Sequence, residues 1–347
     1  MTIPEHQWIN PAQLANELEI SIESNVVALL FGGPGVAKSA VGRQTADKLE
    51  MGYCDFRAAT KDPTEIFGYS APEIANRRLV HCLPEFLPTE NDKPTLINIE
   101  EVNTASHSVM NTLLGFTNER QVGEFHLADH HRIILTGNPP DMGGMVQDMS
   151  DAFTSRFTTY YVKPDLKQWK LDFAFGANIH ADVLAHLELF PDQFWVPDYD
   201  GESNTTHANP RTWELASKHC HGIERRGNGD GAELARWVGT VGPVNGESFA
   251  ATRACRADLV SPLEALLNPD TARTPESSAG CYLIASAMAS IMTDDNVGGI
   301  IRYMDRTGPE YAMFTMRDGA RRNPTIVENV EYLKWATEHA EMFNNAF

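Results

Sequence analysis

The sequence feature that most restricts the fold is a glycine-rich turn between an apolar run and an amphipathic segment. The run, residues 25–31, is rich in β-branched and other apolar residues and predicts a buried strand. The turn reads Gly32-Gly33-Pro34-Gly35-Val36-Ala37-Lys38-Ser39, and residues 40–49 predict a helix behind it. A strand, a glycine-rich loop and a helix in this order are typical of a phosphate-binding loop. The alternative, an ordinary turn followed by a chance Lys-Ser pair, is the less favoured one.

In such a loop, backbone N–H groups and the N-terminus of the helix face the phosphates of a nucleotide. We expect Lys38 to reach the β- and γ-phosphates and the Ser39 hydroxyl to ligate Mg²⁺. Ala37 departs from the usual pattern, which has its last glycine at that position. The residues expected to contact the nucleotide are Gly33, Pro34, Gly35, Val36, Ala37, Lys38, Ser39 and Ala40.

Two acidic residues follow another apolar run, residues 95–99, which predicts a second core strand. Acidic residues at the carboxyl end of a strand beside a phosphate loop are where Mg²⁺ and the attacking water are bound. Glu100, in place of the usual aspartate, is therefore the expected magnesium ligand, and Glu101 the group that orients or deprotonates the water. The alternative is a strand that runs into a solvated helix start, where the helix dipole favours acids.

Three further residues are candidates for the same chemistry. Asn138 follows the apolar strand 132–136, and a polar side chain at that strand tip could touch both the water and the γ-phosphate. Arg156 and Arg211 are candidates because a planar guanidinium binds phosphoryl oxygens in a bidentate way. For each arginine alone, a surface ion pair is the alternative.

Strands alternate with helices up to about residue 163, which predicts an α/β fold with a parallel sheet covered on both faces. The remainder is helical by pattern, and residues 281–292 are apolar nearly all round, as in a buried helix. We expect an α/β nucleotide-binding domain over residues 1–163. A helical region over 164–230 and a helical C-terminal extension over 231–347 follow it.

Charge and composition narrow the class of function. The chain has 347 residues with a formal net charge of −19, which repels nucleic acid at long range. The dense basic cluster is residues 317–322, which we interpret as a surface loop. The apolar runs are shorter than the ~20 residues of a membrane span. The first residues also lack a signal-peptide pattern, so a cytoplasmic protein is expected.

The cysteines and histidines give weaker signals. Five scattered cysteines fit reduced thiols better than a disulfide framework. His219-Cys220-His221 has the residue types of a metal site, but neighbours one residue apart on a helix cannot converge on one ion.

Taken together, residues 25–220 resemble a AAA+ ATPase, and within that superfamily the MoxR group. The matching segments are residues 32–39 (Walker A), 99–105 (Walker B), 113–122, 136–140 (sensor 1), 155–157 (arginine finger) and 210–211 (sensor 2). The resemblance implies ATP and Mg²⁺ as cofactors, a helical lid after the α/β domain, and assembly into a ring, commonly a hexamer. It also implies that Arg156 acts in trans on a neighbour's γ-phosphate and that Arg211 couples the nucleotide to the lid.

MoxR proteins resemble chaperone-like remodellers that work with a von Willebrand factor A (vWA) domain protein. In that group, hairpins at positions corresponding to residues 77–81 and 123–130 line the pore or contact the substrate. The leading hypothesis is therefore an ATP-driven ring that remodels a protein partner.

Two alternatives stay open. One is a nucleic-acid-directed motor or restriction subunit, which the acidic composition counts against. The other is a nucleotide-gated scaffold that barely hydrolyses ATP, because Glu100 replaces aspartate at the magnesium position.

Overall fold

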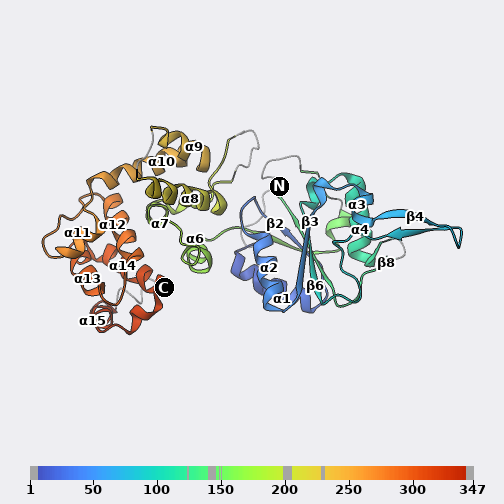
Figure 1. Cartoon of the computed structure of the whole chain (residues 1–347), viewed down its shortest axis with the longest axis horizontal. Coiled ribbons are helices and arrows are strands. Elements are labelled where there is room, and N and C mark those ends of the chain that lie inside the picture. The colour runs from blue at the N-terminus through green and yellow to red at the C-terminus, as the bar shows by residue number, and fades with distance from the viewer. Residues whose placement is uncertain are drawn as a thin grey trace. The chain divides into compact units, whose positions relative to one another are not determined.

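The computed structural model describes residues 7–122, 125–139, 146–147, 149, 151–197, 205–227 and 231–340. The chain divides into two compact units (Figure 1). The first, here the α/β unit, comprises Met1–Asp165 and Pro197–Ser203, and the second, the helical unit, comprises Leu166–Val196 and Asn204–Phe347. Pro140, the last residue of the expected sensor 1 segment, lies outside the described residues.

The α/β unit contains a six-stranded sheet in which every pair of neighbouring strands is parallel, as the alternation of strands and helices predicts. The strand order is β1-β10-β2-β9-β6-β3. The bounds are β1 (Trp8–Ile9), β10 (Thr158–Val162), β2 (Ala28–Phe31), β9 (Arg132–Gly137), β6 (Thr95–Glu100) and β3 (Gly52–Arg57). The strands β1 and β10 extend the sheet beyond the predicted ones, and β1 is too short to show a period.

Helices cover both faces of this sheet (Figure 1). One face carries α1 (Pro11–Glu23) and α2 (Lys38–Lys48), and the other carries α3 (Pro63–Phe67) and α4 (His107–Glu119). Asn10 caps the start of α1, because its side chain accepts from the N–H of Gln13 in a capping box. Gly42 brings α2 close to the sheet, since a Cβ there would lie 2.8 Å from Ile134 Cδ1.

Two β-hairpins are added to this layered core. The predicted hairpin around residues 77–81 is confirmed as β4 (Tyr69–Glu73) paired with β5 (Arg78–Cys82), which extends away from the sheet (Figure 1). The second pairs β7 (Gln121–Val122) with β8 (Phe125–His126), and residues 123 and 124 between them lie outside the described residues.

The helical unit contains two hydrophobic clusters. Trp213, Trp237 and Phe249 lie in the first cluster, and Ile284 and Trp335 in the second. The helices and their bounds are α6 (Leu166–Trp169), η4 (Lys170–Ala174), α7 (Ala181–Leu189), η5 (Pro191–Phe194), α8 (Pro210–Arg226), α9 (Glu233–Val241), α10 (Pro243–Ala254), η6 (Cys255–Asp258), α11 (Pro262–Leu267), α12 (Ser278–Ser290), α13 (Val297–Met304), α14 (Pro309–Arg322), η7 (Pro324–Glu328) and α15 (Val330–Glu338).

The expected domain boundary after residue 163 lies two residues from the division between the units, at Asp165. The first cluster includes residues from both sides of residue 230, the expected second boundary. The division of the chain into three parts stays a prediction. The buried helix expected at 281–292 is confirmed as α12, with eight of its residues buried.

The interpretation of residues 317–322 as a surface loop is wrong. They form the end of α14, and Asp318 is buried. Gly319 allows close packing at this point of α14, because a Cβ there would lie 2.4 Å from Met292 Sδ. Among the described residues, no helix combines the length and the apolar character that a membrane crossing requires.

Candidate functional site

The glycine-rich turn connects the central strand β2 to α2, and close packing fixes its shape. A Cβ on Gly32 would lie 2.7 Å from the Val162 carbonyl oxygen, so that position admits only glycine. Gly35 has φ +78°, a conformation that glycine adopts without strain. Val36 is 1% exposed and anchors the loop in the core, while Pro34 is exposed.

Ala37 has φ 72° and ψ 14°, in the left-handed region. This is the position where the usual phosphate-loop pattern has glycine, so the alanine takes up the backbone conformation that the glycine would have. The left-handed conformation costs a non-glycine residue about 1–2 kcal/mol. Alanine in place of glycine at position 37 therefore does not change the backbone conformation of the loop.

Lys38 is the first residue of α2, and its ammonium group lies against the loop. It donates to the carbonyl oxygen of Gly32 and, at 3.1 Å, to that of Gly33. Ala40 follows in the first turn of α2 and is exposed. The ammonium group and the start of the helix thus lie together at the carboxyl end of β2.

Ser39 and Glu100, the two expected magnesium ligands, are in direct contact. The Ser39 hydroxyl donates to Glu100 Oε1. The other carboxylate oxygen, Oε2, lies 3.5 Å from Nε of Arg57, which is the register partner of Glu100 on β3. A hydroxyl and a carboxylate are hard oxygen donors of the kind that Mg²⁺ prefers, and here one ion could reach both. The two side chains therefore fit a magnesium ion.

Two residues that the sequence analysis missed, Tyr53 on β3 and Asn98 on β6, connect Ser39 to Glu100 through hydrogen bonds. The Tyr53 hydroxyl donates to the Ser39 carbonyl oxygen at 3.2 Å, and Asn98 Nδ2 donates to the Tyr53 oxygen at 2.9 Å. Asn98 Nδ2 also donates to Glu100 Oε1 at 3.3 Å. Burial raises the pKa of Tyr53 to about 12. The available signal was an asparagine in the middle of an otherwise apolar strand.

Glu101, the expected base, follows β6 directly and has φ 57°, in the left-handed region. Its carbonyl oxygen accepts from the Thr104 N–H at 3.1 Å and from the Thr104 hydroxyl at 2.9 Å. These bonds fasten the turn at the start of η3 (Val102–Thr104). The Glu101 side chain is half-buried at the carboxyl end of the sheet, next to Glu100.

Asn138 follows β9, the strand that neighbours β2. Its backbone is held from both sides by Asn103, which the sequence analysis also missed. Asn103 Nδ2 donates to the Asn138 carbonyl oxygen at 2.6 Å, and the Asn138 N–H donates to Asn103 Oδ1 at 3.1 Å. Gly137 leaves room for this clamp, since a Cβ there would lie 2.7 Å from Asn103 Oδ1.

The two candidate arginines are placed differently. Arg156 is exposed in the turn between α5 (Asp151–Thr154) and β10. Because β10 runs parallel to β2, with Thr158 opposite Ala28, Arg156 lies at the amino end of the sheet, whereas the phosphate loop lies at the carboxyl end. Arg211 is exposed in the first turn of α8, in the helical unit.

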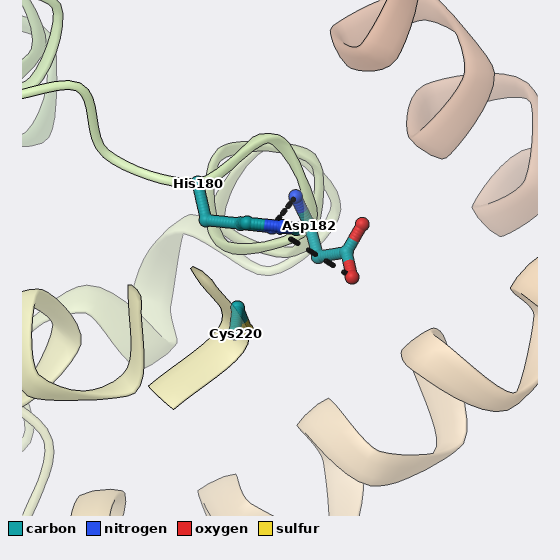
Figure 2. Close-up of side chains that lie close together, drawn as sticks. All are labelled: His180, Asp182 and Cys220. Atoms are coloured by element: carbon teal, nitrogen blue, oxygen red, sulfur yellow. Dashed lines mark hydrogen bonds and ion pairs between the residues drawn. The ribbon is translucent and has the colours of Figure 1, made fainter. Parts of the chain in front are cut away.

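The helical unit contains a buried polar cluster around His180, shown in Figure 2 with Asp182 and Cys220. The N–H of Asp182 donates to His180 Nδ1 at 3.1 Å, and His180 Nε2 lies 3.1 Å from Glu224 Oε1. Arg253 Nε and Arg256 Nη1 each lie 3.0 Å from Asp182 Oδ2. Burial lowers the pKa of His180, against the opposite effect of the nearby carboxylates.

This cluster fits a metal ion poorly, although its side chains lie close enough to share one. Both ring nitrogens of His180 and one oxygen of Asp182 already have partners, and two guanidinium groups at Asp182 would repel a cation. Burial raises the pKa of Cys220 to about 12, which disfavours the thiolate that a metal would need. We interpret the cluster as structural.

The comparisons with known proteins point to one family. Residues 2–161 match the model of the MoxR domain in the MoxR-vWA-beta-propeller ternary systems. A search of curated proteins found no match.

Two solved structures are similar to the chain. One is a "putative ATPase" from Cytophaga hutchinsonii, with 15% identity and a TM-score of 0.38, covering 90% of this chain and 81% of that one. The other is a point mutant of RuvB from Thermotoga maritima, with 12% identity and a TM-score of 0.35, covering 87% and 79%. At these TM-scores, neither similarity bears on the argument.

The family match covers the six-stranded parallel sheet, the phosphate loop, the Ser39–Glu100 pair and the clamped Asn138. It agrees with the family that the motifs indicated. Residues 2–161 of this chain match the MoxR domain model, and they form an α/β unit around a parallel sheet.

Proposed function

We propose that the protein hydrolyses ATP as a subunit of an oligomeric ring and uses the energy to remodel a protein partner. The observation that carries this proposal is the arrangement at the carboxyl end of the sheet. There Lys38 and Ser39 lie at the start of α2, and the Ser39 hydroxyl bonds Glu100 at the end of β6, with Glu101 as the next residue. This is the set of groups that phosphoryl transfer from a nucleotide requires.

In the proposed reaction, Lys38 exchanges the carbonyl oxygens of Gly32 and Gly33 for phosphate oxygens. The N–H groups of the loop and the N-terminus of α2 hold the remaining phosphate charge. Ser39 and Glu100 would hold Mg²⁺, which offsets the charge of the phosphates when it is bound. Glu101 takes a proton from the attacking water, and the Asn138 side chain orients that water.

The position of Arg156 supports assembly. It lies at the end of the sheet opposite the phosphate loop of its own chain, so its guanidinium group is poorly placed to serve that loop. In a ring, the same residue would serve the nucleotide of the neighbouring subunit, and an arginine contributes strongly to such transition states. A hexamer is the ring that the family resemblance implies, and Arg211 would respond to nucleotide from the helical unit.

We propose a vWA domain protein as the partner, because the matched family model is named for MoxR-vWA-beta-propeller systems. The β4–β5 hairpin supports contact with a protein. Tyr69, Ile74 and Leu79 on it are 62%, 87% and 64% exposed, and exposed apolar side chains on a projecting hairpin favour protein binding. A nucleic-acid partner is disfavoured by the net charge of −19. A cytoplasmic location stays a prediction.

The experiment that tests the proposal mixes two inactive variants. Glu101→Gln should bind ATP and lose hydrolysis, and Arg156→Ala should also lose it, by about 1,000-fold if the arginine acts as a finger. Mixed subunits should regain part of the activity, because some interfaces then combine an intact Glu101 with an intact Arg156. Lys38→Ala, which should lose ATP binding, is the control: it should fail to complement Glu101→Gln, because Lys38 and Glu101 must belong to the same subunit at each site.

Phosphate release is measured as a function of the ratio of the two variants. Particle size is measured with and without ATP. Unchanged hydrolysis in Glu101→Gln would show that the base is misassigned. A strictly additive mixture of the two variants would rule out the trans role of Arg156.

A second candidate function is a nucleotide-gated scaffold with little turnover. The observation that favours it is the Arg57 guanidinium, 3.5 Å from Oε2 of Glu100, where its positive charge competes with a metal ion. Normal ATP binding and ring formation, with phosphate release no faster than in Lys38→Ala, would favour this candidate over the first.

A further inference from the structure

We propose that Tyr53 and Asn98 are positioning residues that hold Ser39 and Glu100 as a preformed pair for the magnesium ion. This inference rests on the proposed function, because it concerns the same site. Neither residue belongs to the motifs that indicated the family. Both lie behind the ligands, on β3 and β6, where their side chains face α2.

These four residues form a closed ring of hydrogen bonds that includes the Ser39 backbone carbonyl. The Ser39 hydroxyl donates to Glu100 Oε1, which also accepts from Asn98 Nδ2. The same amide group donates to the Tyr53 oxygen, and the Tyr53 hydroxyl donates to the Ser39 carbonyl oxygen. The hydrogen-bond ring therefore joins the first turn of α2 to the tip of β6, the two elements that supply the ligands.

The hydrogen-bond ring leaves the metal-binding atoms available. Tyr53 bonds to the carbonyl oxygen of Ser39, so the Ser39 hydroxyl keeps its lone pairs for an ion. Asn98 uses one oxygen of Glu100, and a carboxylate oxygen can accept more than one contact. The two residues can thus keep their bonds while Ser39 and Glu100 bind the ion.

Asn98 lowers the stability of the folded state, which indicates that it is present for a role in the site. Its side chain is fully buried on a strand of apolar residues, and its Oδ1 makes no hydrogen bond within the described part of the chain. A buried polar atom without a partner destabilises the folded state. An apolar residue of similar size would avoid that cost but would lose the bonds from Asn98 Nδ2 to Tyr53 and Glu100.

The hydrogen-bond ring also accounts for glutamate at the position where aspartate is usual. Glutamate has one more rotatable bond than aspartate, and a free side chain would lose more conformational entropy on binding an ion. Hydrogen bonds that fix the carboxylate in advance reduce that loss, as in other preorganised sites. In this structure Asn98 and the Ser39 hydroxyl supply those bonds on one oxygen.

The test uses Mn²⁺ as the probe, since it binds hard oxygen ligands like Mg²⁺ and can be followed by electron paramagnetic resonance. The full chain is titrated with Mn²⁺ in the presence of ADP, as wild type, Tyr53→Phe and Asn98→Val. We expect each variant to bind Mn²⁺ about fivefold more weakly, the size of one lost hydrogen bond. Because both act through one hydrogen-bond ring, the double variant should lose less than the product of the single losses.

Thermal unfolding of the same variants separates positioning from a purely structural role. Asn98→Val should unfold at the same temperature as wild type or higher, while its Mn²⁺ affinity falls. Tyr160→Phe is the matched control for Tyr53→Phe, because it removes a hydroxyl that bonds Glu17 on α1, away from the ligands. It should leave Mn²⁺ binding unchanged.

The outcomes of the two proposals are distinct. Wild-type protein that binds neither ADP nor Mn²⁺ would overturn the proposed function. Wild-type binding together with Mn²⁺ affinities in Tyr53→Phe and Asn98→Val within twofold of it would overturn the positioning role alone. Should Asn98→Val fail to fold, Tyr53→Phe, which keeps the aromatic side chain and loses one oxygen, still decides the question.

Discussion

The two units differ in what their buried polar side chains are bonded to. In the α/β unit the polar side chains of the candidate site lie at the carboxyl ends of the strands. There Glu100 Oε1 accepts from Ser39 and Asn98, and Oε2 faces only the exposed guanidinium of Arg57 among the described ion pairs. In the helical unit, acidic and basic side chains in the interior form ion pairs with one another. Arg253 and Arg256 share one oxygen of Asp182, while Lys170 and Arg317 each bind one oxygen of Glu188.

This difference has an energetic meaning. A carboxylate with open coordination capacity can exchange a proton donor for an ion, so the first arrangement suits a ligand. A buried charge that is matched by other buried charges gains little net stability over an apolar core, but losing one partner is costly. We therefore expect substitutions in the first group to change binding and those in the second to change folding.

The largest expected effect on stability comes from Asp182→Ala. It leaves Arg253, whose side chain is 9% exposed, without its partner on Asp182. Breaking a buried ion pair on one side costs about 3–5 kcal/mol. Denaturant unfolding followed by helical circular dichroism measures this loss. Asp192→Ala, which removes an exposed carboxylate of the same unit, should shift the transition by less than about 0.5 kcal/mol.

A second variant sharpens this comparison. Arg253→Met added to Asp182→Ala should recover part of the lost stability, because it removes a buried charge that has lost one of its two carboxylate partners and keeps only Glu233. If the double variant were less stable than Asp182→Ala alone, the pair would be contributing something other than mutual neutralisation.

A smaller effect is expected from His186, which is buried in the first cluster of the helical unit between Thr252 and Gln193. Burial lowers its pKa from 6.5 to about 4, so the folded unit holds it neutral where the unfolded chain would bind a proton. The stability from His186 is complete above pH 6.5 and is lost as the pH falls toward 4. By pH 5 the loss is about 2 kcal/mol.

The measurement compares the free energy of unfolding at pH 7 and pH 5 in wild type and His186→Gln. The variant should lose about 2 kcal/mol less between these two values, since glutamine does not titrate. His219→Gln, at an exposed histidine of the same unit, should lose as much free energy of unfolding between pH 7 and pH 5 as wild type does. An equal slope in wild type and His186→Gln would show that other buried groups, such as His180, carry the pH dependence.

The sequence predicted the α/β unit better than the helical unit, because the main site residues of the α/β unit are fixed by their positions next to strands in the sequence. Gly32 follows β2, Lys38 ends the loop after it, and Glu100 ends β6. Strand position therefore predicted that they would meet at one sheet edge. Tyr53 and Asn103 reach that edge through hydrogen bonds that only the register and the turns determine. In the helical unit, Asp318 was expected in a surface loop, but it is buried in α14. There the charge of Lys170, far away in the sequence, opposes the rise in its pKa that burial causes.

The smallest expected effect tests the path of the phosphate loop itself. Ala37→Gly relieves a left-handed alanine, which costs about 1–2 kcal/mol, but it adds flexibility to the unfolded chain, which costs about 0.5–1 kcal/mol. We expect a gain in stability of less than about 1 kcal/mol and little change in ADP affinity.

Ala40→Gly is the matched control, because the same substitution three residues later falls in the right-handed first turn of α2. It should lower stability by about 1 kcal/mol, the usual cost of glycine in a helix. Both variants are compared by denaturant unfolding of the full chain and by ADP titration. The sign of the difference is decisive: if Ala37→Gly destabilised the α/β unit as much as Ala40→Gly, residue 37 would have to adopt a right-handed conformation. The loop would then lack the bend that turns its N–H groups toward a phosphate.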